Sequence, residues 1–256
     1  MTPTPWLRCR LPRVAPEVRL VCFPHAGGAA SFFTSWTRAL PDTIEVWVVQ
    51  YPGRADRINE PCIEDMAALA RAIAPAISAL AGIPVALFGH SMGAAVAYEV
   101  ARLLQRDPAT APVHLFASGR HAPGEVVDEA VHLLDDEALV RELVRLGATD
   151  GELLRDAEIR SVFLPAIRAD YTLAETYRHL PGPVLDCPIT AVIGTGDPEV
   201  TAAQARRWRE HTSAAFALHG LPGEHFYLVE QAEAVHRLIE RGLTTGSGSP
   251  VGASRH

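Results

Sequence analysis

Residues 85–95 read Val85-Ala86-Leu87-Phe88-Gly89-His90-Ser91-Met92-Gly93-Ala94-Ala95. The apolar start of this stretch predicts a short buried strand, and the alanine-rich segment 92–106, with apolar residues at helical spacing, predicts a helix. Gly-x-Ser-x-Gly between a strand and a helix is typical of a nucleophile elbow, a sharp turn that lifts a serine hydroxyl out of a sheet. Gly89 and Gly93 would keep side chains away from the neighbouring strand and helix. We therefore predict that Ser91 is a nucleophile and that the backbone N–H of Met92 points at the group under attack.

The composition is that of a globular protein. Of the 256 residues, 48% are hydrophobic and 21% are charged, which is enough apolar sequence for one substantial core. The 23 basic and 30 acidic residues give a net charge of −7, which argues against nucleic acid as the main partner. The four cysteines show no Cys-x-x-Cys spacing, so neither a metal site nor a disulfide framework is predicted.

The ends and the apolar runs of the chain bear on its location. The N-terminal residues include several prolines and arginines but no apolar stretch of the kind that secretory signals have. No apolar run approaches the length needed to span a membrane. These features predict a cytoplasmic protein without a membrane partner. No pattern for a subunit interface stands out, and we expect a monomer.

Apolar runs alternate with helical patterns along most of the chain. The runs expected to form strands are residues 19–23, 44–50, 85–88, 113–118, 189–193 and 216–221. The segments expected to form helices are residues 31–40, 62–81, 92–106, 201–211 and 226–242. This alternation predicts an α/β protein with a mostly parallel central sheet and helices on both faces. In such sheets the functional site lies at the carboxyl ends of the strands.

The region of about 120–186 interrupts this alternation, because it contains no strand-like run. Segments 137–146 and 157–177 have the pattern of amphipathic helices. We expect a helical insertion over one end of the sheet, a lid; the alternative is that these helices belong to the outer layer of the sheet. Residues 1–243 are then expected to form a single domain, and the Gly/Ser-rich residues 244–256 a disordered tail.

A serine hydroxyl becomes an effective nucleophile when a base within hydrogen-bond reach takes its proton. Among the 11 histidines, His225 has the required context, because it follows the predicted strand 216–221 through a short turn and so lies at a carboxyl end. A surface or helix-capping role is the alternative for His225. His25, in a glycine-rich loop, is a candidate to line the site, but a packing or loop-ordering role is favoured for it. His90 is expected to point away from Ser91.

An acid is expected to orient the imidazole and to stabilise its protonated form. Asp197 follows the predicted strand 189–193 through Gly194-Thr195-Gly196, again at a carboxyl end. Helix capping alone is the alternative role for Asp197. Glu224 is the rival acid because it is adjacent to His225, but adjacent side chains in a turn rarely face one another, and we favour Asp197.

Catalysis at a serine also needs N–H donors for the oxyanion that develops in the transition state. Met92 is expected to supply one donor. The loop after the first central strand, Pro24-His25-Ala26-Gly27-Gly28, is expected to supply the second from Ala26, because its glycines keep side chains off an approaching carbonyl group. An ordinary flexible loop is the alternative.

Five motifs occur in a fixed order along the chain: Phe23–Gly28, Gln50–Arg54, Phe88–Gly93, Gly194–Pro198 and Pro222–Leu228. Together they resemble the discrete type II, or editing, thioesterases that accompany polyketide synthases and non-ribosomal peptide synthetases, and the likeness covers about residues 6–243. Two residues depart from the family pattern. Gly196 stands where members often have a polar or acidic residue, and Glu224 stands where a second glycine usually precedes the histidine.

The resemblance implies an α/β-hydrolase fold with a helical lid, a triad of Ser91, Asp197 and His225, and an oxyanion hole formed by the backbone N–H groups of Ala26 and Met92. It also implies hydrolysis of aberrant or stalled acyl groups from the phosphopantetheine arm of an acyl or peptidyl carrier protein, through an acyl-serine intermediate. The pathway would be polyketide or peptide antibiotic biosynthesis. The enzyme itself would need no metal and no cofactor, since the substrate carries the phosphopantetheine.

Two other functions stay open at this point. A small-molecule carboxylesterase would act on free esters and gain nothing from a carrier protein. A non-catalytic ligand-binding protein would keep the same fold without the chemistry.

Substrate choice is expected to lie in the predicted lid. Candidate residues to line an acyl pocket are Phe163, Tyr171 and Tyr177, with a plain core role as the alternative. Docking of an acidic carrier protein would need a local basic patch, since the overall charge is negative. The candidates are Arg54 and Arg57, or Arg206, Arg207 and Arg209, with an ordinary solvated surface as the alternative.

Overall fold

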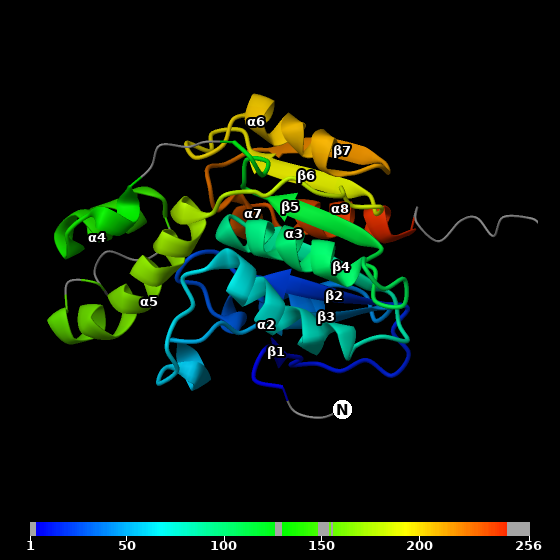
Figure 1. Ribbon diagram of the computed structural model, residues 1–256, viewed down its shortest axis with the longest axis horizontal. Helices are drawn as coiled ribbons and strands as arrows, with labels where there is room; N and C mark the ends of the chain where they lie inside the picture. Colours follow the sequence, from blue (N-terminus) through cyan, green and yellow to red (C-terminus); the bar gives the residue numbers. More distant parts are fainter. Residues whose placement is uncertain (1–3, 126–129, 148–153, 155, 245–256) are drawn as a thin grey trace, which may run out of the picture.

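The apolar runs of the sequence form a seven-stranded sheet in the computed structural model of the chain, which describes residues 4–125, 130–147, 154 and 156–244 (Figure 1). The strands are β1 (Leu7–Arg8), β2 (Val18–Phe23), β3 (Ile44–Val49), β4 (Val85–His90), β5 (His114–Ser118), β6 (Ile189–Gly194) and β7 (Phe216–Leu221). Their order across the sheet is β1-β3-β2-β4-β5-β6-β7. All strands from β2 to β7 run parallel, and β1 pairs with β3 in the antiparallel direction. The predicted mostly parallel sheet is confirmed.

Helices cover both faces of this sheet, as predicted. The helical elements are η1 (Ala30–Phe33), α1 (Trp36–Ala39), η2 (Ala55–Arg57), α2 (Met66–Ser78), α3 (Met92–Leu104), η3 (Val131–Leu133), α4 (Asp136–Arg145), α5 (Ala157–Thr176), α6 (Ala202–Arg206), η5 (Arg207–His211), α7 (Tyr227–Glu230) and α8 (Ala232–Thr244). One apolar core packs α2 and α3 against the sheet, and a second packs α1, α7 and α8 against the opposite face. β4 lies between the two cores and is buried along its whole length, which explains its continuous apolar sequence.

Local hydrogen bonds set the helix bounds. The helix expected over 62–81 begins at Met66, because the Asp65 carboxylate accepts a hydrogen bond from the backbone of Ala68 at 2.7 Å and caps it. The helix expected over 226–242 is divided into α7 and α8 at Gln231. No helix in the described part of the chain has both the length and the apolar character that crossing a membrane requires.

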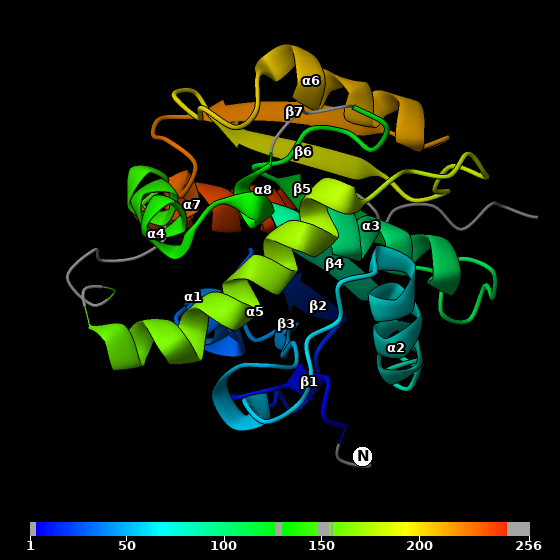
Figure 2. The ribbon, with the colours of Figure 1, turned by 60° about the vertical axis from the view of Figure 1, so that its left-hand side comes forward.

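The segment between β5 and β6 lies at one end of the sheet. It holds η3, α4 and α5, and the described part of it contains no strand. Figure 2, in which this end is turned forward, shows α5 running diagonally in front of the strands. Leu139, Leu143, Leu164 and Ile167 are among the residues that form a small apolar core of this segment.

The predicted domain division stays a prediction, both for residues 1–243 as one domain and for residues 120–186 as a lid. The predicted tail, apart from Thr244, lies outside the described residues, as do residues 126–129, 148–153 and 155.

Candidate active site

The Gly-x-Ser-x-Gly sequence forms the expected sharp turn between β4 and α3. Ser91 lies at its apex with φ 55° and ψ −122°, a conformation that non-glycine residues rarely adopt. A Cβ atom at Gly89 would lie 2.2 Å from the carbonyl oxygen of Gly93, and one at Gly93 would lie 2.1 Å from that of Phe23. The two glycines are therefore required by the close approach of three backbone segments. The backbone N–H of Ser91 donates to the carbonyl of Ser118 on β5 at 2.8 Å and so ties the elbow to the sheet.

His225 and Asp197 lie side by side on the loops that follow β7 and β6. The Nδ1 atom of His225 is 3.1 Å and 3.0 Å from the two carboxylate oxygens of Asp197, and the Asp197 side chain is fully buried. The carboxylate beside the imidazole is thus that of Asp197, whereas the rival Glu224 is exposed. The Asp197 Oδ1 atom also accepts a hydrogen bond from the backbone of Glu199 at 2.9 Å.

The loops that carry Asp197 and His225 are joined by backbone hydrogen bonds, although they contain Gly196 and Glu224, the two residues that depart from the family pattern. The backbone N–H of Gly196 donates to the carbonyl of Gly223 at 2.9 Å, and that of Thr195 donates to Leu221 at 2.8 Å. The two loops also approach each other at Gly194, where a Cβ atom would lie 2.3 Å from the carbonyl oxygen of Glu224.

Four of the predicted site residues meet at one small cavity of about 40 Å³. Ser91, His225, Ala26 and Met92 line it from the sheet side. Residues of the segment between β5 and β6 line it from the other side, among them Leu146, Tyr171 and Ala174. A cavity of about 250 Å³ adjoins it and shares Arg120, Ala174 and Glu175 as lining residues.

The predicted pocket residues of α5 and its end therefore divide into two groups. Tyr171 lines the small cavity and Tyr177 the adjoining one. Phe163 lines neither and is 49% exposed, so the expectation that it faces the acyl pocket is wrong. It lies near the start of α5, whereas the part of the helix that faces the cavity is its second half.

The loop 24–28 places the backbone of Ala26 at this cavity. The backbone N–H of Gly28 donates to the carbonyl of His25 at 2.9 Å, and Gly27 has φ +78°, so Ala26 and Gly27 are the central residues of a type II turn. Within the described part of the chain, the N–H groups of Ala26 and Met92 donate to no other group. Both are thus available to a group bound at Ser91.

A family model described as the thioesterase domain matches residues 18–243. The chain belongs to the thioesterase family. Thioesterase PikA5 of Streptomyces venezuelae is 42% identical over 251 residues, which are 96% of this chain and 88% of that protein.

Solved structures of type II thioesterases share the fold of this thioesterase. BorB, the type II thioesterase of the borrelidin biosynthetic cluster, has 43% identity and a TM-score of 0.87, with 95% of this chain and 99% of BorB covered. YbtT, from the yersiniabactin NRPS/PKS biosynthetic pathway, has 31% identity and a TM-score of 0.87, with 95% of this chain and 100% of YbtT covered. The predicted α/β-hydrolase fold, the thioester-hydrolase class and the resemblance to type II thioesterases are therefore confirmed.

Two further histidines of the thioesterase lie beside His225 and are neutral. The His90 ring is 5.0 Å from that of His225, and its pKa is well below the ordinary value because the side chain is buried and lies near His225 and His25. Burial, followed by the charges of His225 and Arg54, lowers the pKa of His25 to about 3. Near neutral pH neither ring adds a positive charge next to His225.

The proton on His90 is fixed by a chain of hydrogen bonds that the sequence did not indicate. The Tyr227 hydroxyl donates to the carbonyl of Val192 at 3.0 Å, so it must accept from the Ser118 hydroxyl, 2.7 Å away. Ser118 in turn must accept from His90 Nδ1 at 2.9 Å. His90 therefore carries its proton on Nδ1 and, as expected, is directed into the protein rather than toward the cavity at Ser91.

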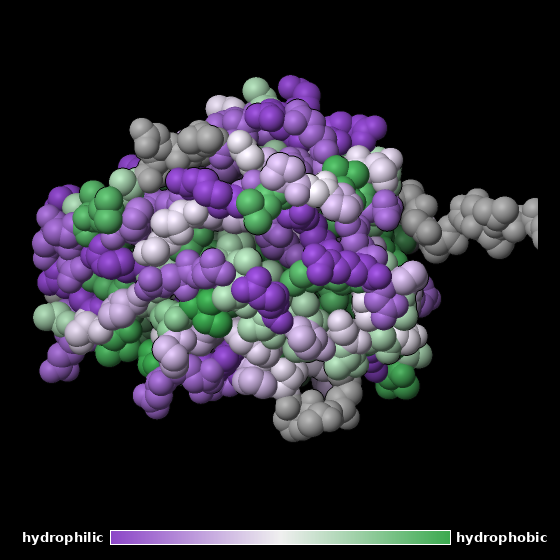
Figure 3. Space-filling view, viewed as in Figure 1, coloured by the Kyte–Doolittle hydropathy of each residue, from purple (hydrophilic) through white to green (hydrophobic). Residues whose placement is uncertain are grey.

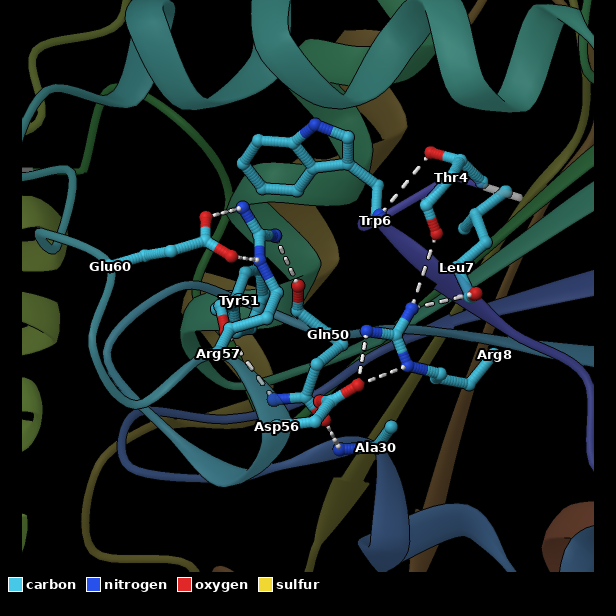
Figure 4. Close-up of polar contacts among 10 residues, drawn as sticks. All are labelled: Thr4, Trp6, Leu7, Arg8, Ala30, Gln50, Tyr51, Asp56, Arg57 and Glu60. Atoms are coloured by element: carbon cyan, nitrogen blue, oxygen red, sulfur yellow. Dashed lines mark hydrogen bonds and ion pairs between the residues drawn. The ribbon is translucent and has the colours of Figure 1, made fainter. Parts of the chain in front are cut away.

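The first predicted basic patch is wrong, because Arg54 and Arg57 are 4% and 6% exposed. Figure 4 shows Arg57 between Trp6 and Glu60. Its guanidinium lies 4.1 Å from the centre of the Trp6 ring and donates to the Glu60 carboxylate at 2.5 Å. It also donates to the carbonyl of Gln50 at 2.8 Å. Arg54 pairs with Asp170 of α5. Arginines in a Pro/Gly turn look exposed from sequence, but Arg54 is covered by its contact with the buried Asp170, and Arg57 is covered although its partner Glu60 is exposed.

The second predicted patch is at the surface. Arg206, Arg207 and Arg209 are exposed on α6 and η5, and the surface over α6, at the top of Figure 3, is strongly hydrophilic. Arg207 forms ion pairs with Glu125 and Glu210, so part of its charge is balanced. Within the described residues, no group of three or more His, Cys, Asp or Glu side chains is arranged to hold a metal ion.

Proposed function

We propose that this thioesterase hydrolyses aberrant or stalled acyl groups from the phosphopantetheine arm of acyl or peptidyl carrier proteins. The observation that carries the proposal is the cavity lined by Ser91, Ala26, Met92 and His225. His225 pairs with Asp197, and the backbone N–H groups of Ala26 and Met92 donate to no other described group. The pathways of its relatives BorB and YbtT support the choice of a synthase-bound substrate.

The reaction would proceed through an acyl-serine intermediate. His225 takes the proton of the Ser91 hydroxyl, and the serine oxygen attacks the thioester carbonyl. The carbonyl oxygen becomes an oxyanion held by the N–H groups of Ala26 and Met92. The carbon–sulfur bond then breaks, and His225 gives its proton to the leaving pantetheine thiolate. In the second half-reaction His225 takes a proton from water, the hydroxide oxygen attacks the acyl-serine ester, and the Ser91–acyl bond breaks. His225 returns that proton to the Ser91 oxygen, which releases the carboxylic acid and free Ser91.

Asp197 supports both half-reactions. Its carboxylate accepts a hydrogen bond from His225 Nδ1–H, which leaves Nε2 free to take the serine proton. The same carboxylate stabilises the imidazolium that forms. Because His25 and His90 are neutral, this imidazolium has no second cationic imidazole beside it.

The segment 120–186 would act as the lid in this proposal. Leu146, Tyr171 and Ala174 would contact the acyl group, and a longer chain would extend toward the adjoining cavity past Tyr177. The partner would be an acyl or peptidyl carrier protein, for which Arg206 and Arg209 are the surviving docking candidates. We take the enzyme to act as a monomer in the cytoplasm, without a cofactor of its own.

The test uses a carrier protein loaded with an acyl-phosphopantetheine. Incubation with the wild type should remove the acyl mass from the carrier protein, and Ser91→Ala should leave it in place. Persistence of the acyl group with the wild type would exclude this function. Equal kcat/KM values on a free ester and on the carrier-bound thioester would indicate a carboxylesterase instead. Absence of a fluorophosphonate adduct on Ser91 would indicate a non-catalytic protein.

A further inference from the structure

A buried ion pair joins α5 to the loop that carries Ala26. Arg54 donates to both carboxylate oxygens of Asp170, at 2.5 Å and 2.8 Å, and the two side chains are only 5% and 7% exposed. The same carboxylate accepts a hydrogen bond from the backbone N–H of Gly27 at 2.7 Å. Arg54 also donates to the carbonyl of Gly28 at 3.3 Å. Asp170 thus contacts the middle of the loop, and Arg54 contacts its last residue.

Other hydrogen bonds hold the start of this loop and the residue Ala30 beyond its end. The Tyr51 hydroxyl donates to the carbonyl of Pro24 at 3.2 Å, and the backbone N–H of Ala30 donates to the Gln50 side chain at 3.0 Å. Tyr51 and Gln50 directly follow β3, and Arg54 lies in the same segment. Pro24 and Ala30 therefore depend on the segment after β3, whereas Gly27 in the middle of the loop depends on a side chain of α5.

Apolar packing presses the same face of α5 onto the loop. Ile167 lies three residues before Asp170, and a Cβ atom at Gly27 would lie 2.8 Å from its Cγ1 atom. Ala166 approaches Gly53 in the same way, with 3.6 Å between its Cβ atom and the position of a Cβ at Gly53. The helix is thus in direct contact with both turns, and small movements of α5 must alter the hydrogen bond to Gly27.

The carboxylate also selects the conformation of the turn. In a type II turn the central peptide, here between Ala26 and Gly27, is reversed relative to a type I turn. The observed turn directs the N–H of Gly27 at the Asp170 carboxylate. A reversed peptide would direct the carbonyl of Ala26 at the same negative charge, which is unfavourable in a buried setting. Asp170 therefore fixes the peptide that follows Ala26, which adjoins the His25–Ala26 peptide whose N–H is the proposed oxyanion donor.

We propose that Arg54 and Asp170 are positioning residues of the oxyanion hole. Because Asp170 belongs to α5, the thioesterase has full activity only while α5 lies on the loop 24–28. The planar, two-point contact of the guanidinium fixes the direction of the carboxylate, and the carboxylate fixes the Ala26–Gly27 peptide. This inference rests on the proposed role of the Ala26 N–H in the reaction.

The experiment compares Asp170→Ala with the matched control Arg168→Met. Arg168 lies on the same helix but donates to Asp136 at 2.7 Å and to the carbonyls of His132 and Leu134, all within the segment between β5 and β6. Two rates are measured for each variant: hydrolysis of propionyl-pantetheine, and labelling of Ser91 by a fluorophosphonate, followed by intact mass. The phosphonyl oxygen occupies the oxyanion hole, so labelling reports on the hole without any thioester.

For Asp170→Ala we expect both kcat and the labelling rate to fall by about 10- to 100-fold, with KM within about twofold of the wild type, because an oxyanion donor is lost for much of the time. Arg168→Met should keep both rates within about twofold. A merely structural role would lower the melting temperature and leave kcat and labelling unchanged in the folded protein. That result would overturn the proposal.

A second variant keeps the test decisive if Asp170→Ala fails to fold. The double replacement Arg54→Met with Asp170→Leu removes both charges and leaves no unpaired ion, a change that buried pairs often tolerate. It should show the same loss of kcat and of labelling, and full rates in this variant would refute the inference. Failure of the proposed function is distinguishable, because the wild type would then spare the carrier-bound acyl group while the labelling rates of the variants still differ.

Discussion

Replacement of Asp197 by Asn changes one atom of the carboxylate and should reverse the hydrogen bond to His225. The backbone N–H of Glu199 donates to the Oδ1 atom of Asp197 at 2.9 Å, so the amide oxygen of Asn must occupy that position. The amide nitrogen then occupies the position of Oδ2, 3.0 Å from His225 Nδ1. Since an amide N–H only donates, this nitrogen opposes a proton on Nδ1 and favours the tautomer with the proton on Nε2, in competition with the amide oxygen 3.1 Å from Nδ1. This tautomer has no lone pair on Nε2 with which to take the proton of Ser91.

The expected fall in kcat follows from the loss of His225 as the base. In serine proteases with a Ser-His-Asp triad, the same substitution at the acid keeps the geometry and lowers kcat by about 10⁴-fold, which corresponds to about 5 kcal/mol of transition-state stabilisation. We expect a loss of similar size here for propionyl-pantetheine hydrolysis. KM should change by less than about threefold, because no group that contacts the acyl chain is altered.

The assay is steady-state hydrolysis of propionyl-pantetheine with the folded state checked by circular dichroism. Glu224→Gln is the matched control, since Glu224 is the neighbouring exposed acid, and it should retain kcat within about twofold. Retention of more than a tenth of wild-type kcat by Asp197→Asn would contradict the assignment. So would an equal loss in Glu224→Gln, which would move the role of the acid to Glu224.

Three further predictions concern stability. Burial lowers the pKa of His25 from 6.5 to about 3, so the unfolded chain takes up a proton below pH 6.5 that the folded chain does not. The free energy of unfolding should therefore fall between pH 7 and pH 5 by about 2 kcal/mol more in the wild type than in His25→Phe, as measured by urea denaturation. Ser91→Gly should relieve the strain at φ 55° and raise Tm by about 2–4 °C while abolishing hydrolysis; an unchanged or lower Tm would argue against stored strain. Gly93→Ala should prevent folding, because its Cβ would meet the Phe23 carbonyl oxygen at 2.1 Å, whereas Gly196→Ala, at 3.4 Å from the Gly223 oxygen, should fold; soluble, fully folded Gly93→Ala would refute the steric argument.

The sequence predicts the sheet well because each strand is a local feature. The predicted strand 189–193 corresponds to β6 (Ile189–Gly194), a continuous apolar run that is buried along its whole length. The predicted strand 216–221 corresponds to β7 (Phe216–Leu221), a half-buried strand at the edge of the sheet. The helix bounds are less predictable. Whether a helix begins at Cys62 or at Met66 depends on one capping hydrogen bond, which the Asp65 carboxylate accepts from the backbone of Ala68. Apolar periodicity carries no information about this bond.

The site residues that the sequence predicts share a simple property, which is that they follow strands either directly, as Ser91 does, or through a short turn, as Asp197 and His225 do. Ser91, Asp197 and His225 each lie at the carboxyl end of a strand that a local pattern reveals. The residues that it misses depend on distant partners. Arg54 is buried only because Asp170, 116 residues further along the chain, balances its charge, and no local pattern can show that pairing.

The two halves of the proposed machinery differ in what holds them. The acid–base half depends on the loops after β6 and β7, which are joined to each other by the backbone bonds Gly196–Gly223 and Thr195–Leu221. The oxyanion half depends in its middle on Asp170 of α5. If α5 moves away, Ser91 keeps its base but loses one donor for the oxyanion. Acyl transfer would then be slow in the open state, and a substrate that draws α5 onto the loop would complete the site that consumes it. Changes at the Arg54–Asp170 pair should accordingly slow both acyl-enzyme formation and its hydrolysis, because the same oxyanion forms in each step.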